Sequence, residues 1–241
     1  MELTPLPLSS FVGRDQELVE IRRLLRSTRL VTLVGPGGVG KSRLAAQAAG
    51  EISTGFADGI AFVPLATVRD PSLAPSAIAQ AVGAWEQGAR PLPDYLADAL
   101  RARHLLLVLD NFEQLLSAAP LVSGLLDDCP KLAVLVTSRA ALHLPMEATF
   151  VVPPLAMPDP SRPVPASQLA AYDAVRLFTE RARQVRPDLM LTDELAGIVA
   201  QICRRLDGLP LAIELAAARI RHLEPTELLG RLVRRLPVLT E

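Results

Sequence analysis

One short segment combines glycines, a lysine and a serine at a spacing that suits phosphate binding. Residues 35–42 read GPGGVGKS, which fits the pattern G-x-x-x-x-G-K-S. In such a loop the backbone amides turn inward around phosphate oxygens, helped by the N-terminus of the helix that follows. Lys41 would neutralise the β- and γ-phosphates, and the Ser42 hydroxyl would ligate Mg²⁺. The nucleotide-contacting residues expected from this segment are Gly35, Gly37, Gly38, Val39, Gly40, Lys41, Ser42 and Arg43.

Two further polar residues follow apolar runs. Residues 105–109 are all apolar and lead directly into Asp110, and residues 132–138, LAVLVTS, lead into Arg139. An aspartate at the end of a buried strand can hold Mg²⁺ directly or through water, although it can also cap the next helix. An arginine in the second position can distinguish a triphosphate from a diphosphate by binding the γ-phosphate; a surface ion pair is the alternative.

The elements that position these residues alternate between strands and helices. Apolar runs predict strands at 30–34, 59–65, 105–109, 132–138 and 148–152, and periodic patterns predict helices at 15–26, 41–50 and 111–127. This alternation predicts a parallel sheet covered by helices on both faces. Ligands bind at the carboxyl ends of the strands in such sheets. The glycine-rich loop, Asp110 and Arg139 all fall at strand ends of this kind.

A proline-rich segment divides the chain. Residues 153–167 suit an extended connector rather than a helix or a central strand. Beyond it the pattern is helical only, at 168–185, 193–206, 210–222 and 225–235. The expected organisation is an N-terminal segment with a helix (1–28), an α/β core (29–152), the connector (153–167) and an all-α subdomain (168–241).

Composition excludes several classes of protein. The chain has 241 residues, of which 50% are hydrophobic, and a net charge of −1. A charge so close to zero favours neither nucleic acid nor membrane as a direct partner. The two cysteines suit small buried residues rather than a metal site. Since the chain shows no signal-peptide pattern and no apolar stretch of ~18 residues, a cytoplasmic location is expected.

Six segments occur in the order typical of one family. They are FVGRDQEL (11–18), the glycine-rich loop, LLLVLDNFEQL, LVTSRAAL, AVRLFTERA (174–182) and CRRLDGLPLAIELAAARI (203–220). Together they resemble the signal-transduction ATPases with numerous domains (STAND). That class includes the NB-ARC or AP-ATPase module shared by plant resistance proteins and apoptotic protease-activating factors. The similarity is greatest to the central ATPase of large bacterial transcriptional regulators.

The resemblance implies a fold and a set of roles. The fold would be a three-layer P-loop NTPase core followed by a small helical lid. The implied ligands are ATP or ADP with Mg²⁺, the metal being held by Ser42 and Asp110. In the family, the segment that matches Val12, Gly13 and Arg14 lies against adenine and ribose, and a motif that matches Gly208-Leu209-Pro210 brings the proline onto the base. From the residues alone, the latter motif is a helix stop followed by proline in the next helix.

Two departures from the family pattern affect function. Many relatives follow the strand-end aspartate with a second acid that orients the attacking water, whereas this chain has Asn111. Asparagine can hydrogen-bond water but cannot accept its proton, so Glu113 is the candidate base; an exposed residue in a first helical turn is the alternative. Relatives also continue into a winged-helix domain, which does not follow residue 241. The chain is therefore expected to be part of a larger regulator.

These observations favour a regulatory nucleotide switch with slow hydrolysis, in which Lys41, Asp110, Glu113 and Arg139 would carry the chemistry. Expected partners are further domains of the same protein, namely the winged helix, sensor repeats and a DNA-binding effector, together with nucleotide-dependent self-association. A P-loop kinase is the alternative, and it would need a substrate pocket and an arginine-bearing lid. A motor-like ATPase would need brisk turnover and a neighbouring arginine, and nothing in the sequence identifies one.

Overall fold

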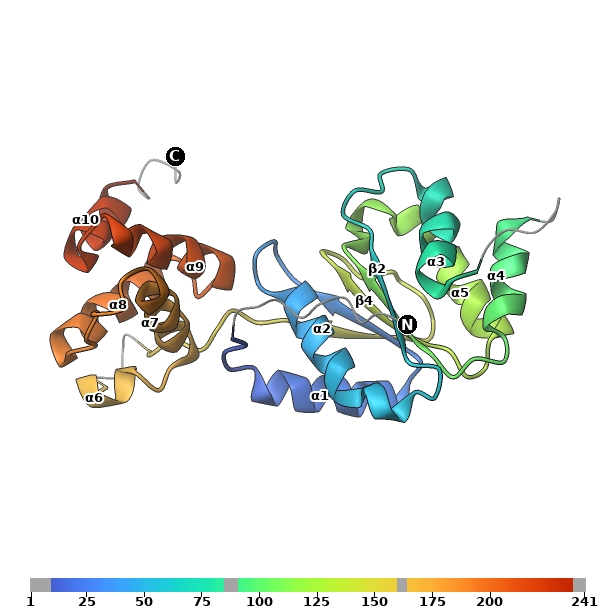
Figure 1. The fold of residues 1–241 in the computed structure, drawn as a ribbon, viewed down its shortest axis with the longest axis horizontal. Helices are drawn as coiled ribbons and strands as arrows, with labels where there is room; N and C mark the ends of the chain where they lie inside the picture. Colours follow the sequence, from blue (N-terminus) through green and yellow to red (C-terminus); the bar gives the residue numbers. More distant parts are fainter. Residues whose placement is uncertain (1–9, 85–90, 160–163, 236–241) are drawn as a thin grey trace. The chain divides into compact units, whose positions relative to one another are not determined.

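The computed structural model describes residues 10–84, 91–159 and 164–235, which form two compact units (Figure 1). The α/β unit contains Met1–Ser10, Arg14–Gly37 and Lys41–Val152. The helical unit contains Phe11–Gly13, Gly38–Gly40 and Pro153–Glu241. Residues 1–9 of the expected N-terminal segment and residues 160–163 of the expected connector lie outside the described residues.

The α/β unit is built on a five-stranded sheet in which every pair of neighbouring strands is parallel. The strand order is β2-β3-β4-β1-β5. The strands are β1 (Leu30–Val34), β2 (Ile60–Pro64), β3 (Leu106–Asp110), β4 (Ala133–Ser138) and β5 (Glu147–Val151). The predicted parallel sheet is confirmed. Its order places β4 between β1, which leads into the glycine-rich loop, and β3, which ends at Asp110.

Helices cover both faces of this sheet (Figure 1). They are α1 (Asp15–Ser27), α2 (Lys41–Ile52), α3 (Ala74–Val82), α4 (Leu92–Leu100) and α5 (Ala119–Asp128), with single 3₁₀ turns at Ser53–Gly55 and Pro71–Leu73. Side chains alternate between the faces of a strand. Leu107 and Leu109 of β3 accordingly pack in one cluster with α3, α4 and α5. Val108, which is equally buried, lies outside that cluster, on the face that α2 covers.

The helix predicted at 111–127 begins later than expected. Two 3₁₀ turns, Phe112–Gln114 and Leu116–Ala118, come first, and α5 starts at Ala119. Asn111 itself has a left-handed backbone with a φ of 63°, so it cannot be part of an α-helix. Pro120 then occupies the first turn of α5, where a missing N–H costs nothing. This delay places Glu113 in a turn rather than on a regular helix.

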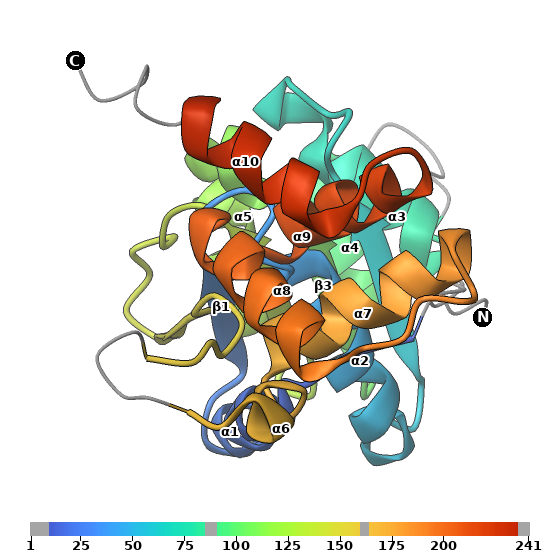
Figure 2. The same ribbon diagram turned by 90° about the vertical axis from the view of Figure 1, so that its left-hand side faces the viewer.

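The helical unit contains α6 (Ala166–Leu169), α7 (Asp173–Val185), α8 (Asp193–Arg205), α9 (Pro210–Ala218), a 3₁₀ turn at Arg219–Arg221 and α10 (Pro225–Arg235). The single helix predicted at 168–185 is therefore two helices, α6 and α7. Helices α7, α8 and α9 pack around one apolar core, in which Phe178, Ile202 and Ile213 are fully buried (Figure 2). The prediction that this part of the chain is all-helical is confirmed.

No helix among the described residues combines the length and the apolar character that crossing a membrane requires.

Candidate functional site

The glycine-rich loop joins the end of β1 to the start of α2. Gly38 and Gly40 have φ values of 78° and 96°, a region that residues with a Cβ rarely adopt. These two glycines therefore allow the loop to turn back on itself before Lys41 begins α2. Val39 is fully buried and anchors the loop. A turn of this kind, at the N-terminus of a helix, is suited to binding anions through backbone amides.

Lys41 is buried beside this loop, with 7% of its surface exposed. Its Nζ donates hydrogen bonds to the carbonyl oxygens of Gly35 at 2.9 Å and Pro36 at 3.1 Å. Burial lowers the pKa of the Lys41 ammonium, and the nearby Glu113 carboxylate partly opposes this shift. An ammonium has three donors, so these two bonds leave one for an anion. The loop thus presents a desolvated positive charge at the end of β1.

Asp110 ends β3 and is also buried, with 8% of its surface exposed. The Thr137 hydroxyl, from the neighbouring strand β4, donates to Asp110 Oδ1 at 2.6 Å. The same hydroxyl oxygen accepts the Asn111 backbone N–H at 2.9 Å. Asp110 is therefore held by Thr137 and does not cap the next helix. The apolar pattern of β4 predicts no role for Thr137, although its position near the end of a buried strand is a signal that could have indicated one.

Glu113 lies in the 3₁₀ turn after Asn111, and its side chain is only 16% exposed. Its Oε1 forms an ion pair with Arg139 Nε at 3.3 Å. Its Oε2 is buried, and it finds no hydrogen-bond partner among the described residues. A buried carboxylate oxygen without a partner is costly, which marks a position where water or a ligand is expected. Glu113 is thus not the exposed first-turn residue of the alternative interpretation.

Arg139 follows β4 and is 68% exposed. Besides its ion pair with Glu113, it lies beside the glycine-rich loop, since a Cβ placed on Gly37 would be 3.6 Å from Arg139 Nη2. The side chain therefore forms an ion pair and also lies beside the glycine-rich loop. The role of Arg139 toward a γ-phosphate stays a prediction.

The expected metal ligands were Ser42 and Asp110. Ser42 is half-buried in the first turn of α2, next to Arg43, which donates to the Ser10 carbonyl. In the described part of the chain, no group of three or more His, Cys, Asp or Glu side chains is placed to hold a metal ion. Mg²⁺ commonly binds through one or two protein oxygens together with phosphates and water. The donors present fit that manner of binding and do not fit an all-protein cage.

The residues expected near adenine are divided between the two units, with Arg14 in the α/β unit and Val12, Gly13 and Pro210 in the helical unit. Val12 is buried in the apolar cluster of the helical unit. Gly13 and Arg14 both have left-handed backbones, and the buried Arg14 donates to Glu17 Oε1 at 2.8 Å. Pro210 is the first residue of α9. These positions therefore have well-defined local structures, and their roles toward adenine stay predictions.

The sheet order and the site together define a class of protein. A glycine-rich loop leads from β1 into α2, a buried aspartate ends β3, and β4 lies between these strands. This is the arrangement of a P-loop NTPase. The chain belongs to the family described as Novel STAND NTPase 1, whose model matches residues 7–211.

Curated relatives are longer than this chain. An uncharacterized protein of Mycobacterium tuberculosis is 44% identical over 226 residues, which is 93% of this chain and 54% of that protein. A putative HTH-type transcriptional regulator of the same organism is 43% identical over 209 residues, or 86% of this chain and 22% of the regulator. The chain therefore spans about half of the first relative and about a fifth of the second.

Solved structures share the fold. A STAND protein with a tetratricopeptide repeat sensor from Pyrococcus horikoshii superposes with a TM-score of 0.57 at 16% identity. The match covers 97% of this chain and 33% of that protein. At this level of identity the similarity concerns the fold alone.

Proposed function

We propose that this chain is an ATP- and ADP-binding regulatory switch that hydrolyses ATP slowly in the presence of Mg²⁺. One observation carries the proposal. At the carboxyl edge of the sheet, the Lys41 ammonium and the Asp110 carboxylate are both buried, and Glu113 Oε2 is buried without a partner. A cation for phosphate, an acid for a metal and a free acceptor for a proton are the groups that phosphoryl transfer to water requires.

Binding rests on the loop and on two oxygen donors. Lys41 would exchange its bonds to the Gly35 and Pro36 carbonyls for bonds to phosphate oxygens, which are stronger because both partners are charged. Ser42 and Asp110 would hold Mg²⁺, which supplies neutralisation of phosphate charge when it is bound. The Thr137 hydroxyl keeps one oxygen of Asp110 fixed, so the other remains available in a defined direction.

The proposed base for hydrolysis is Glu113. Its unpartnered Oε2 has the lone pairs to accept a proton from water, which the Asn111 amide cannot do. In this role Glu113 would orient a water molecule and take its proton as the water oxygen bonds to the γ-phosphorus, while the bond from that phosphorus to the bridging oxygen breaks and ADP leaves. Asn111 then contributes through its backbone, because its N–H holds the Thr137 oxygen.

Slow turnover follows from the ion pair that Glu113 makes. Arg139 holds the other oxygen of the same carboxylate at 3.3 Å. If Arg139 binds a γ-phosphate, it must share or give up its ion pair with Glu113. Binding of the γ-phosphate by Arg139 and release of Glu113 to act as the base are therefore linked. The pair also restrains Glu113 before a triphosphate arrives. A site arranged in this way favours retention of the nucleotide over rapid hydrolysis.

The regulatory part of the proposal rests on the relatives. One relative is named as a putative HTH-type transcriptional regulator, and the chain covers 22% of it. Within such a protein, nucleotide exchange would shift a conformational equilibrium by the difference in affinity of the two conformations for ATP and ADP. Val12, Gly13, Arg14 and Pro210 are the residues proposed to recognise adenine.

The test is to denature freshly purified protein, identify any released nucleotide by chromatography, and then measure a single turnover of added ATP. The proposal expects bound ADP or ATP near one equivalent and hydrolysis much slower than one per second. Lys41→Met serves as the matched control and should carry no nucleotide. Turnover of many per second would refute the switch, and a wild-type chain that neither carries nor binds nucleotide would refute the site.

A further inference from the structure

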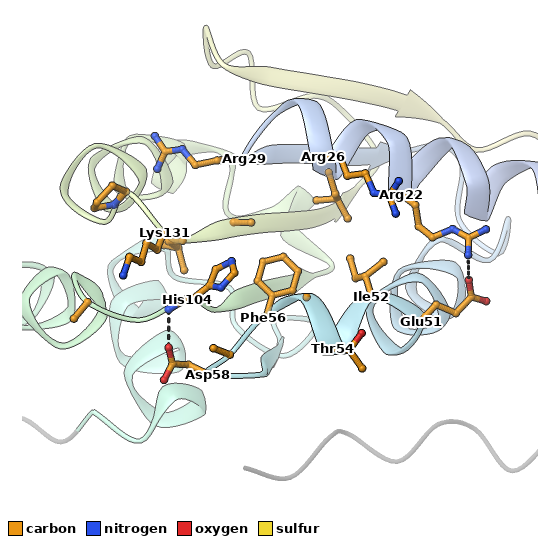
Figure 3. A pocket seen from close by; sticks show the side chains of 17 residues that line it. Arg22, Arg26, Arg29, Glu51, Ile52, Thr54, Phe56, Asp58, His104 and Lys131 are labelled. Atoms are coloured by element: carbon orange, nitrogen blue, oxygen red, sulfur yellow. Dashed lines mark hydrogen bonds and ion pairs between the residues drawn. The ribbon is translucent and has the colours of Figure 1, made fainter.

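A pocket lies in the α/β unit at the opposite edge of the sheet from Asp110 (Figure 3). Strands β1, β3 and β4 are parallel, so they begin at this edge and end at the nucleotide edge. The pocket is lined by the end of α1, the turn after α2 and the segments that precede β3 and β4. Its volume is about 880 Å³, which lies in the range of pockets for small molecules. The proposed nucleotide chemistry uses none of its residues.

Two aromatic rings lie in the middle of this pocket. The centroids of Phe56 and His104 are 5.2 Å apart, and their planes are inclined by 50°. Figure 3 shows the rings next to each other, with Ile52 on the far side of Phe56. The segment that carries Phe56 is joined to the segment that carries His104 by Asp58, whose carboxylate accepts the His104 backbone N–H at 2.7 Å. The rings therefore form an ordered aromatic surface with an angle between its two faces, within a polar rim.

Four cationic side chains surround these rings, and two of them have structural roles. Arg22 forms an ion pair with Glu51 at 3.0 Å. Arg29 donates to the carbonyl oxygens of Leu126 at 2.7 Å and Cys129 at 3.1 Å, where α5 ends. Cations commonly neutralise the carbonyl ends of helices in this way. These two arginines are therefore accounted for by the fold.

Arg26 and Lys131 are different. Both are exposed, and neither has an ion pair or a hydrogen bond in the part of the chain that the structure describes. Figure 3 places Lys131 on the His104 side of the rings and Arg26 on the Phe56 side. Arg26 lies in the last turn of α1, where a positive charge is favoured by the helix dipole. The dipole does not account for the position of Arg26 at the pocket. Two cations without partners flank an aromatic surface, an arrangement that matches a flat ligand carrying negative charge.

We propose that this pocket binds a planar aromatic anion. The ring of the ligand would pack on Phe56 and His104, and its carboxylate or phosphate would bind Arg26, Lys131 or both. Offset or edge-to-face packing of aromatic rings and charge-assisted hydrogen bonds are the interactions that such a ligand would gain. Binding here does not depend on the proposed nucleotide function.

The test uses 2-naphthoate and 2-naphthyl phosphate as probes of the full chain. The chain has three histidines, so the ring protons of His104 can be followed by NMR while His143 and His222, which do not line the pocket, act as internal references. The inference expects saturable shifts of the His104 signals alone. The same titration should be obtained with Lys41→Met, which excludes binding at the glycine-rich loop. Tighter binding of one probe identifies the anionic group that the pocket prefers.

Variants separate a specific pocket from general attraction. Arg26→Gln, Lys131→Gln or both should weaken binding about 10-fold or more, the usual effect of losing one hydrogen bond to a charged group, and unchanged binding in both variants would also overturn the inference. Arg23→Gln is the matched control, because Arg23 is on the same helix, pairs with Glu20 at 2.6 Å and does not line the pocket. Equal loss in Arg23→Gln, equal binding of neutral 2-naphthamide, or shifts that do not saturate would each overturn the inference.

Discussion

The two units of the molecule both bury polar side chains, but among the residues that the structure describes, only the α/β unit leaves such groups unpaired. In the helical unit, Thr179 donates within its own helix at 2.8 Å, and Arg181 donates to Glu214 at 3.0 Å. Among the described residues, the buried side-chain atoms without a partner are Thr32 Oγ1 and Glu113 Oε2, both in the α/β unit. Buried polar groups that are fully paired support folding. Of the two unpaired atoms, the Thr32 hydroxyl oxygen lies inside β1, whereas Glu113 Oε2 lies in the turn that follows β3, where water or a ligand is expected. The contrast between the units therefore rests on Glu113.

The largest expected effect tests the unpaired oxygen. Glu113→Gln keeps the size of the side chain but removes its ability to accept a proton, so single-turnover ATP hydrolysis should fall by about 10²–10⁴-fold. Nucleotide affinity should stay close to that of the wild type. Asn111→Gly is the matched control, because glycine accepts the left-handed backbone and retains the N–H to Thr137. If Asn111→Gly lost as much activity as Glu113→Gln, the choice of base would be wrong.

Lys41→Met separates binding from stability. Loss of a buried cation that contacts phosphate should weaken nucleotide binding by about 100-fold, as measured by calorimetric titration. Burial lowers the pKa of Lys41 in the folded protein, so the charged form destabilises the fold at neutral pH. The nucleotide-free variant should therefore unfold in urea at the same or a higher concentration than the wild type. This advantage should shrink as the pH rises through the lowered pKa of Lys41 toward 10.5, its unperturbed value. A clear loss of stability at pH 7 would contradict this account.

In the helical unit, loss of a buried cation should lower stability and leave nucleotide affinity unchanged, which is the reverse of the effect expected for Lys41→Met. Arg181→Met removes a buried guanidinium from its pair with Glu214, so the free energy of unfolding should fall by about 1–3 kcal/mol. Nucleotide affinity, measured under conditions where the variant is folded, should not change. Arg231→Met, which breaks an exposed pair with Glu227, is the control and should cost less than about 1 kcal/mol. A large change of affinity with unchanged stability in Arg181→Met would remove the contrast between the units.

The smallest effect concerns the hydroxyl that holds Asp110. Thr137→Val preserves shape and removes the 2.6 Å bond, so hydrolysis at saturating Mg²⁺ should fall about 10-fold, which corresponds to one hydrogen bond. A higher Mg²⁺ requirement should accompany this loss. Thr137→Ser restores the donor and should recover most of the rate. Failure of serine to rescue would show that packing of the β4 end, rather than the bond, matters.

Much of the fold follows from local patterns. Strands such as Leu106–Asp110 are uninterrupted apolar runs, and the glycine-rich loop carries its own spacing. The expected strands begin and end within a residue or so of the observed ones. The left-handed backbone of Asn111 was not expected, because one residue's conformation is set by its tertiary surroundings. The break between α6 and α7 was missed since both halves continue one helical period.

The site was predictable only in part for a related reason. Asp110 and Arg139 were identified because each follows an apolar run at the end of a strand. The hydrogen bond from Thr137 to Asp110 depends on β3 and β4 being neighbours in the sheet. The apolar pattern of a single strand does not predict which strand lies beside it. The contact between Arg139 and Glu113 likewise joins two loops that follow different strands. The pocket around Phe56 combines four segments distant in sequence, so no motif marks it.

The left-handed backbone at position 111 has a consequence for how this protein could change over evolution. Asparagine and aspartate are the side-chain-bearing residues that adopt this conformation most easily, besides glycine. An aspartate at position 111 would therefore fit the existing backbone, and it would add a second acid beside Asp110 without rebuilding the turn. Under the proposed mechanism, the exchange of this one amide for a carboxylate would supply the second acid that Asn111 does not provide. Selection on the lifetime of the bound state could thus act through a single codon.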